Sequence, residues 1–251
     1  MAILDTGSQP AANGKLEIEI WRGRSEDGAF NTYEVPEQAH QTVLDVVTYV
    51  QRRIDATLAY RFACRVGMCG SCAMTVNGVP RWTCRTDVKT VARKGRLVIE
   101  PLRNLPVVKD LVTDMAPFFD KWQAAEGRLH ATADRGTEVA TIDPASPERK
   151  AADAGVECIN CAVCYSACDV VTWNPDYLGP AALNRAWTLQ NDERDGGKAE
   201  RLRAVTSDGG CQNCHSHQSC TEHCPVGLSP TASIAGLKRM AARAAFWRGI
   251  R

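Results

Sequence analysis

Residues 64–72, CRVGMCGSC, place three cysteines in a C-x4-C-x2-C run, and Cys84 follows after eleven intervening residues. This is the spacing of a plant-type 2Fe-2S centre, in which two bridged irons need four thiolates. Gly67 and Gly70 lack a Cβ and so allow backbone N–H groups to approach such a centre closely. A zinc knuckle is the alternative, but structural zinc sites use paired C-x2-C spacings. We therefore predict a 2Fe-2S cluster on Cys64, Cys69, Cys72 and Cys84.

A second run, residues 158–168, reads CINCAVCYSAC and has the C-x2-C-x2-C-x3-C spacing of bacterial ferredoxins. In those proteins the first three cysteines hold one four-iron cluster, and the fourth holds the other cluster of a pair. The proline that commonly follows the fourth cysteine is Asp169 here. Two zinc-type pairs are the alternative, but four cysteines this close together suit an iron-sulfur cube better than one tetrahedral ion.

The third group of cysteines lies between Cys211 and Cys224 and supplies the reciprocal run. Counting back from Cys224 gives cysteines at four and ten residues, but the residue at seven is His217. One cluster corner thus lacks a thiolate, which suits a 3Fe-4S cluster, and fewer anionic ligands favour a higher reduction potential. Exchange of ligands between the runs predicts a 4Fe-4S cluster on Cys158, Cys161, Cys164 and Cys224. It predicts the 3Fe-4S cluster on Cys168, Cys214 and Cys220.

Cys211 is the cysteine that this exchange leaves over. It is either a bystander thiol or a fourth ligand that makes the second centre 4Fe-4S, and His217 could take that role in its place. Spacing favours the set of three thiolates.

The overall composition excludes several other classes of protein. With 44% hydrophobic residues the 251-residue chain can build ordinary cores, so its twelve cysteines need not be the disulfides of a short secreted protein. A formal charge of +1 argues against nucleic-acid binding. The chain has no 18-residue apolar run free of charge, so we predict no transmembrane span. Residues 1–14 lack the apolar core of a secretory signal, so we expect the protein in the cytoplasm.

The N-terminal half has the pattern of strands packed on one helix. Apolar alternation and turn signals predict short strands. They cover residues 15–21, 32–35, 73–76, 80–84 and 97–100. Asn77-Gly78 predicts a hairpin, and helical spacing over residues 43–54 predicts a helix that Thr42 caps.

The C-terminal half has the pattern of helices. An apolar face from Val108 to Phe118 predicts a connecting helix, and residues 126–153 are poor in large apolar groups. Further helices are predicted at residues 180–191, 198–205 and 231–247. The predicted fold class is α+β. The predicted domains are a 2Fe-2S ferredoxin domain with its connecting helix at 1–122, a linker at 123–153 and a helical two-cluster domain at 154–251.

Nearly the whole chain resembles the iron-sulfur subunit of succinate dehydrogenase and fumarate reductase, the succinate:quinone oxidoreductases. The resemblance rests on the three cysteine groups and on the stretches that flank them. These stretches are residues 64–72 (CRVGMCGSC), 104–112 (NLPVVKDLV), 158–164 (CINCAVC), 174–183 (NPDYLGPAAL) and 224–230 (CPVGLSP).

The resemblance implies an N-terminal β-grasp domain and a C-terminal α-helical ferredoxin domain. It implies a flavoprotein partner with covalent FAD, where succinate and fumarate interconvert, and a membrane anchor, usually with haem b, where menaquinone or ubiquinone reacts. The chain would relay electrons from the 2Fe-2S centre at the flavin through 4Fe-4S to 3Fe-4S at the quinone. It would be a peripheral protein on the cytoplasmic face of the inner membrane, working in respiration and the tricarboxylic acid cycle.

In relatives with a quinone pocket, a tryptophan and a histidine line that pocket, and they match Trp173 and His215. Two departures from the pattern are Asp169 and His217, the latter at an apolar pocket position. The alternative is that Trp173 packs against the anchor or the core and that His215 bonds a cluster sulfide.

The sequence also favours a relay over a complete enzyme. Gly67 and Gly70 sit inside the cysteine loop, so no dinucleotide fingerprint is formed, and no nucleophile or carboxylate pair indicates a dicarboxylate site. Two other hypotheses stay open. The chain could be the relay subunit of another flavin-dependent dehydrogenase, or a zinc scaffold without redox chemistry.

Overall fold

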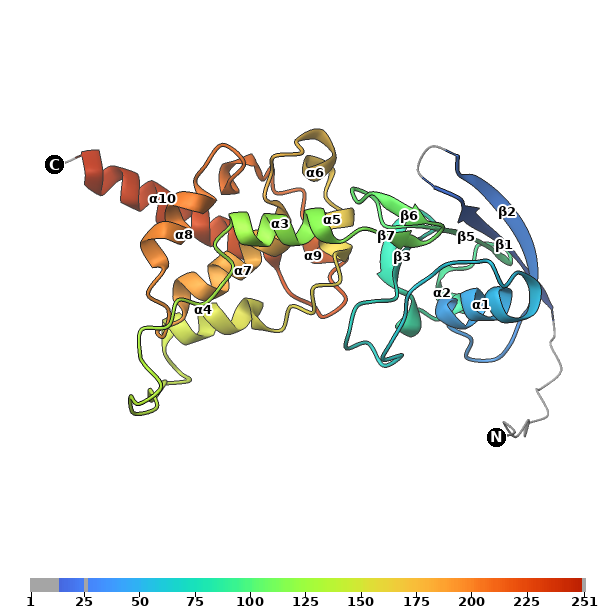
Figure 1. The fold of residues 1–251 in the computed structure, drawn as a ribbon, viewed down its shortest axis with the longest axis horizontal. Coiled ribbons are helices and arrows are strands. Elements are labelled where there is room, and N and C mark those ends of the chain that lie inside the picture. Colours follow the sequence, from blue (N-terminus) through green and yellow to red (C-terminus); the bar gives the residue numbers. More distant parts are fainter. Residues whose placement is uncertain (1–13, 25–26, 250–251) are drawn as a thin grey trace. The chain divides into compact units, whose positions relative to one another are not determined.

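The computed structural model describes residues 14–24 and 27–249, and the chain divides into two units. Unit 1 comprises Met1–Pro101 and Val107–Thr113, and unit 2 comprises Leu102–Pro106 and Asp114–Arg251. Figure 1 shows the sheet of unit 1 and the helices of unit 2. The predicted α+β class is confirmed.

Unit 1 is built on a five-stranded sheet with the order β2-β1-β5-β3-β4. The strands are β1 (Lys15–Arg22), β2 (Ala29–Pro36), β3 (Ala73–Val76), β4 (Val79–Trp82) and β5 (Arg96–Glu100). β1 and β5 are parallel, whereas the other neighbours are antiparallel. Asn77 and Gly78 adopt φ of 49° and 80° and close the β3–β4 hairpin, as the Asn-Gly pair predicts.

The core of unit 1 lies between this sheet and the helix α1 (Val43–Tyr49), which continues as a π-helical turn η1 (Val50–Ile54). Thr42 caps the helix in a reciprocal box, because its hydroxyl accepts the Asp45 N–H at 3.2 Å while its own N–H bonds the Asp45 carboxylate at 3.0 Å. Alternate strand residues and one helix face are fully buried together. They include Leu16, Ile18, Ile20, Val46, Val47, Leu97 and Ile99.

The predicted helix from Val108 to Phe118 is wrong over its first half. The chain there forms a hairpin of β6 (Val107–Lys109) and β7 (Val112–Thr113). Asp110 turns the chain with φ of 51°, and its buried carboxylate accepts the N–H groups of Gly23 and Ala59, each at 2.8 Å. These contacts with distant residues override the helical spacing, which a local pattern cannot anticipate.

Unit 2 is helical and is centred on α7 (Gly179–Asn191), which packs against α3, α4, α8 and α10. These four helices are α3 (Ala116–Ala124), α4 (Pro147–Val156), α8 (Lys198–Val205) and α10 (Pro230–Gly249). Shorter helices carry the cysteine runs. They are α5 (Val163–Ser166), α6 (Asp169–Trp173), α9 (Ser219–Glu222) and the 3-10 turn η3 (Cys211–Asn213). Unit 1 has two short helical segments as well, α2 (Val88–Val91) and the 3-10 turn η2 (Thr83–Arg85).

The division into units differs from the predicted domain boundaries at α3, which we expected in the N-terminal domain. Phe118 of this helix is buried in unit 2, with its ring edge-on to Tyr165 at a centroid distance of 5.6 Å. Its apolar face therefore assigns the helix to the core of unit 2.

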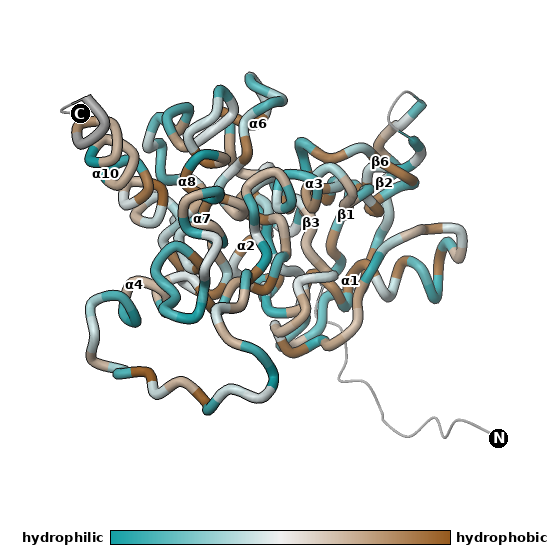
Figure 2. The backbone as a smooth tube through the Cα atoms, turned by 60° about the vertical axis from the view of Figure 1, so that its left-hand side comes forward, coloured by the Kyte–Doolittle hydropathy of each residue, from teal (hydrophilic) through white to brown (hydrophobic). Residues whose placement is uncertain are grey.

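The segment 123–153, predicted as a linker, is a long loop only in its middle (Figures 1 and 2). Arg201 binds the first part of this segment, because its guanidinium donates to the carbonyls of Glu126 and Arg128 at 2.9 and 3.0 Å. Its last part is α4, which the pattern missed because this helix packs through small residues. Gly155 lies so close to α7 that its carbonyl accepts the Asn184 side chain at 3.2 Å.

Membrane crossing requires a helix of about 20 apolar residues. No helix in the described part of the chain has both that length and that character.

Candidate metal centres

The cysteine loop of unit 1 aims its backbone N–H groups at its own sulfur atoms. The Cys64 sulfur accepts the N–H groups of Met68 and Cys69 at 3.2 and 3.3 Å. Hydrogen bonds from the N–H groups of Val66 and Met68 lower the pKa of Cys64 to about 6, which favours the thiolate that binds iron. Three residues of the loop have the positive φ that allows this wrapping: Arg65, Gly67 and Gly70.

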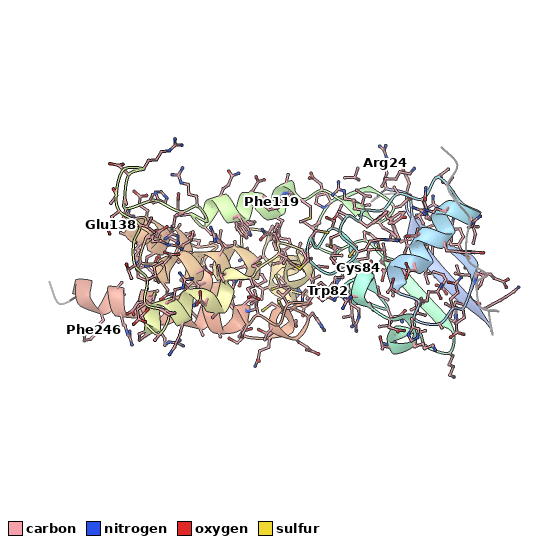
Figure 3. The ribbon with its side chains drawn as sticks, turned by 90° about the horizontal axis from the view of Figure 1, so that it is seen from below. Arg24, Trp82, Cys84, Phe119, Glu138 and Phe246 are labelled. Carbon is pink, nitrogen blue, oxygen red and sulfur yellow. The ribbon has the colours of Figure 1, made fainter. Side chains whose placement is uncertain are left out.

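Cys84 reaches the same site from the 3-10 turn that follows β4. Its N–H lies 3.5 Å from the Cys72 sulfur, and the Thr83 hydroxyl donates to the Cys72 carbonyl at 2.8 Å. Burial and the neighbouring Cys72 thiol raise the pKa of Cys84 to about 11. Gly67 packs closely against Trp82, since a Cβ at this position would lie 2.9 Å from the Trp82 ring. Figure 3 shows Trp82 beside Cys84.

Four thiols of unit 2 lie in the wall of one small cavity. They belong to Cys158, Cys161, Cys164 and Cys224, the set assigned to the 4Fe-4S cluster. The rest of the wall is largely apolar and includes Phe118 of α3 and Ala181 of α7. The loop between α9 and α10 brings Cys224 to residues some sixty positions earlier, as the exchange of ligands requires.

Burial governs the electrostatics of these four thiols. It raises the pKa of Cys161 to about 12 and that of Cys164 well above its ordinary value, because a lone thiolate has no counter-charge there. The neighbouring thiols act in the same direction. An iron centre supplies the missing positive charge, so four convergent sulfurs around this cavity fit a cluster.

A second small cavity in unit 2 has three thiols in its wall, those of Cys168, Cys214 and Cys220. This is the set assigned to the 3Fe-4S cluster. The Cys214 sulfur accepts the N–H of Ser216 at 3.4 Å. Three sulfurs around one cavity fit a three-iron centre by donor chemistry.

The two residues left open by spacing lie differently. Cys211 is fully buried in η3 but does not line the cavity, whereas His217 does. The His217 ring lies 6.0 Å from that of Trp173 and 5.9 Å from that of His215, between centroids. His217 therefore lies next to both predicted pocket residues, Trp173 and His215. The Trp173 side of this group faces solvent, since 68% of the surface of Trp173 is exposed.

Tyr177 and Thr231 also line this cavity, and the cysteine spacing predicts neither of them. Both lie in or beside stretches that carry the family resemblance, since Tyr177 is part of NPDYLGPAAL and Thr231 follows CPVGLSP. A hydroxyl next to a cysteine motif is the available signal, but only the fold shows that both residues line the cavity of the three thiols.

Two family models match the chain. A 2Fe-2S iron-sulfur cluster binding domain matches residues 16–120, and a 4Fe-4S dicluster domain matches residues 157–229. Together with the cavities, these matches define a two-domain iron-sulfur protein with one cluster-binding region in each unit.

Relatives identify the family. The fumarate reductase iron-sulfur subunit of Mycobacterium tuberculosis is 36% identical over 228 residues, which cover 90% of this chain and 92% of the relative. The succinate dehydrogenase iron-sulfur subunit of Paracoccus denitrificans is 37% identical over 221 residues, covering 86% and 82%. The chain belongs to the family of succinate dehydrogenase and fumarate reductase iron-sulfur subunits, which confirms the resemblance seen in the sequence.

A solved structure agrees with this assignment. A chain of the Mycobacterium smegmatis Sdh1 complex in the apo form matches with a TM-score of 0.82 at 26% sequence identity, covering 92% of this chain and 97% of that one.

Proposed function

We propose that this chain is the electron-transfer subunit of a membrane-bound succinate:quinone oxidoreductase. It relays electrons between FAD in a flavoprotein subunit and a quinone at a membrane anchor. The observation that carries the proposal is the grouping of eleven thiols into three sets, four in unit 1 and four and three around the two cavities of unit 2. The identity of the relatives supports the choice of complex.

Within this proposal each set holds one cluster. Cys64, Cys69, Cys72 and Cys84 hold 2Fe-2S. Cys158, Cys161, Cys164 and Cys224 hold 4Fe-4S, and Cys168, Cys214 and Cys220 hold 3Fe-4S. When bound, each cluster supplies one-electron redox chemistry. The chain's own residues shape that chemistry, because backbone N–H groups stabilise negative charge on the sulfurs of unit 1 and apolar walls keep water from the four-thiol cavity.

The dicarboxylate reaction belongs to the flavoprotein partner in this proposal. The chain itself is peripheral, on the cytoplasmic face of the cell membrane, and the anchor carries haem b. The three-iron centre faces the quinone. The rings of Trp173, His215 and His217 beside the three-thiol cavity support this end as the quinone side, since exposed aromatic and imidazole groups suit contact with an amphipathic ligand.

The intact complex tests the proposal. We expect succinate-dependent quinone reduction and about nine irons per copy of this chain. A full load of iron without that activity would favour the relay of another flavin-dependent dehydrogenase. A colourless protein with zinc would favour the scaffold.

One pair of variants tests the ligand sets. Cys161→Ser removes a predicted ligand of the four-iron cluster, so we expect loss of its paramagnetic resonance signal and of electron flow, with the 2Fe-2S signal kept. Cys211→Ser is the matched control, because it removes a buried thiol outside the wall of either cavity. Wild-type quinone reduction in Cys161→Ser, or loss of a centre in Cys211→Ser, would contradict the assignment.

A further inference from the structure

The three-thiol cavity differs from the four-thiol cavity in the hydroxyl groups that approach its sulfurs. The Thr231 hydroxyl, at the start of α10, lies 3.3 Å from the Cys220 sulfur. In the wall of the four-thiol cavity none of the described side chains carries a hydroxyl. There the Cys224 sulfur accepts a backbone N–H instead, that of Leu228 at 3.3 Å.

The surrounding hydrogen bonds fix the direction in which Thr231 donates. The Thr231 N–H donates to the Thr221 hydroxyl oxygen at 3.4 Å, and the Thr221 hydroxyl donates to the Thr231 oxygen at 3.0 Å. The Thr231 oxygen is thus already an acceptor, and its own proton is free for the sulfur. A thiolate bound to iron carries no proton, so it can only accept. The chain of two hydroxyls therefore ends on Cys220.

Tyr177 supplies a second hydroxyl to the same cavity. Its side chain is 1% exposed and lines the same cavity wall as Cys214. A phenol is protonated at neutral pH, so the Tyr177 hydroxyl is available as a donor. Its backbone is held as well, since the Tyr177 N–H donates to the Asn174 carbonyl at 3.1 Å.

We propose that Thr231 and Tyr177 are positioning residues that donate hydrogen bonds to the Cys220 and Cys214 sulfurs and thereby raise the reduction potential of the centre in this cavity. The inference rests on the proposed function, because it requires a cluster on Cys168, Cys214 and Cys220. A donor hydrogen next to sulfur stabilises the state with more negative charge, which is the reduced one. The centre is reduced by one electron and then reoxidised by passing one electron on. Both hydroxyls keep their protons, and neither is oxidised.

The test is a potential titration of the intact complex, followed by the paramagnetic resonance of the three-iron centre. Thr231→Val keeps the shape of the side chain and removes the donor. At a fixed ambient potential we expect the ratio of reduced to oxidised centre to fall about threefold, and about tenfold together with Tyr177→Phe. Tenfold corresponds to about 59 mV for a one-electron couple. The four-iron centre should keep its potential in both variants.

Two controls separate tuning from folding. Thr231→Ser retains a hydroxyl and should restore the wild-type potential. Thr188→Val removes another buried hydroxyl of unit 2, one that donates to the Asn184 carbonyl at 3.0 Å, and should lower stability without moving the potential. As a second readout, exchange into D2O should place deuterons coupled to the wild-type centre, and Thr231→Val should lose one of these couplings while those of the Tyr177 hydroxyl and the Ser216 N–H remain.

The outcomes distinguish this inference from the proposed function. A wild-type complex without a three-iron signal would contradict the proposed function. A normal signal whose potential is the same in wild type, Thr231→Val and Tyr177→Phe would overturn the inference alone. If Thr231→Val fails to hold its cluster, Tyr177→Phe, which acts on the other sulfur, decides the question by the same measurement.

Discussion

Cys64 of unit 1 and Cys161 of unit 2 have the same side chain, but their surroundings shift its pKa in opposite directions. Backbone N–H groups lower the pKa of Cys64 to about 6, whereas burial raises the pKa of Cys161 to about 12. The first thiol lies on an irregular loop that donates hydrogen bonds to its sulfur, and the second lies in an apolar wall. Cys64 is therefore prepared as a thiolate before iron arrives, whereas Cys161, like Cys84 of unit 1, depends on iron to supply the counter-charge.

The packing of the two units leads to the same contrast. Unit 1 has a continuous core between its sheet and α1, and the cysteine loop lies outside it. Unit 2 surrounds its cavities with α5 and α9, helices of four residues each. Helices that short do not persist without tertiary support. We infer that the clusters are part of the folding energy of unit 2 and only an addition to a formed unit 1.

The largest expected effect is therefore that of iron removal. Anaerobic chelation should leave the amides of β1 and β5 protected from hydrogen exchange and should unprotect those of α5 and α9 by more than about 100-fold, since metal sites of this kind supply several kcal/mol of folding energy. Exchange followed peptide by peptide measures both units in one sample. Equal loss of protection in the two units, or in neither, would break the comparison.

A second test concerns the fully buried ion pair of unit 2. Arg201 and Asp195 are both 0% exposed in their side chains and are joined by two bonds of 2.8 and 3.0 Å. Arg201→Met leaves Asp195 buried without its partner, so we expect a loss of about 3–5 kcal/mol in urea unfolding of the iron-loaded chain. Arg201→Met with Asp195→Leu should cost less than Arg201→Met alone. A larger cost for the double variant would show that the pair itself, not the orphaned charge, governs stability.

Much of this architecture was readable because its causes are local. Asn77-Gly78 needs only its own backbone freedom to make a turn, and each cysteine run can be recognised from spacings of a few residues. The strand alternation before Trp21 and the cap at Thr42 are likewise visible within a short window. Each of these predictions depends on residues that are neighbours in the sequence.

The predictions that failed depend on distant contacts. The spacing from Val108 to Phe118 is helical, yet Asp110 bonds the backbone at Gly23 and Ala59 and bends the chain into a hairpin. α4 lacks an apolar stripe because it meets α7 through Ala152 and Gly155, where small size rather than hydrophobicity is the requirement. The hydroxyl of Thr231 gains its significance only when α10 brings it to Cys220.

Within unit 2 a buried carboxylate differs from the buried thiols, because a neighbouring cation lowers its pKa whereas burial raises the pKa of the thiols. Paired hydrogen bonds from Arg194, at 2.7 and 2.9 Å, lower the pKa of Asp192 to about 2. A depressed pKa stabilises the fold above the ordinary carboxyl pKa near 3.9, and this contribution is lost as the pH falls from about 4 to 2. We expect about 2 kcal/mol in urea unfolding, absent from Asp192→Asn. A pH profile of Asp192→Asn parallel to that of wild type would contradict this.

The smallest effect gives the most direct comparison, because each unit has a hydroxyl cap of the same kind. Thr42 accepts the Asp45 N–H at the start of α1, and Ser146 accepts the Arg149 N–H at 3.0 Å at the start of α4. Replacing either by Ala removes a hydrogen bond worth about 1 kcal/mol. In iron-loaded protein Thr42→Ala and Ser146→Ala should each show that loss in their own unit by hydrogen exchange. After chelation Thr42→Ala should cost the same, because unit 1 still folds, whereas Ser146→Ala should cost almost nothing, because α4 has lost the packed unit that its cap stabilised. A persistent Ser146→Ala penalty without iron would mean that α4 and α7 form a core of their own.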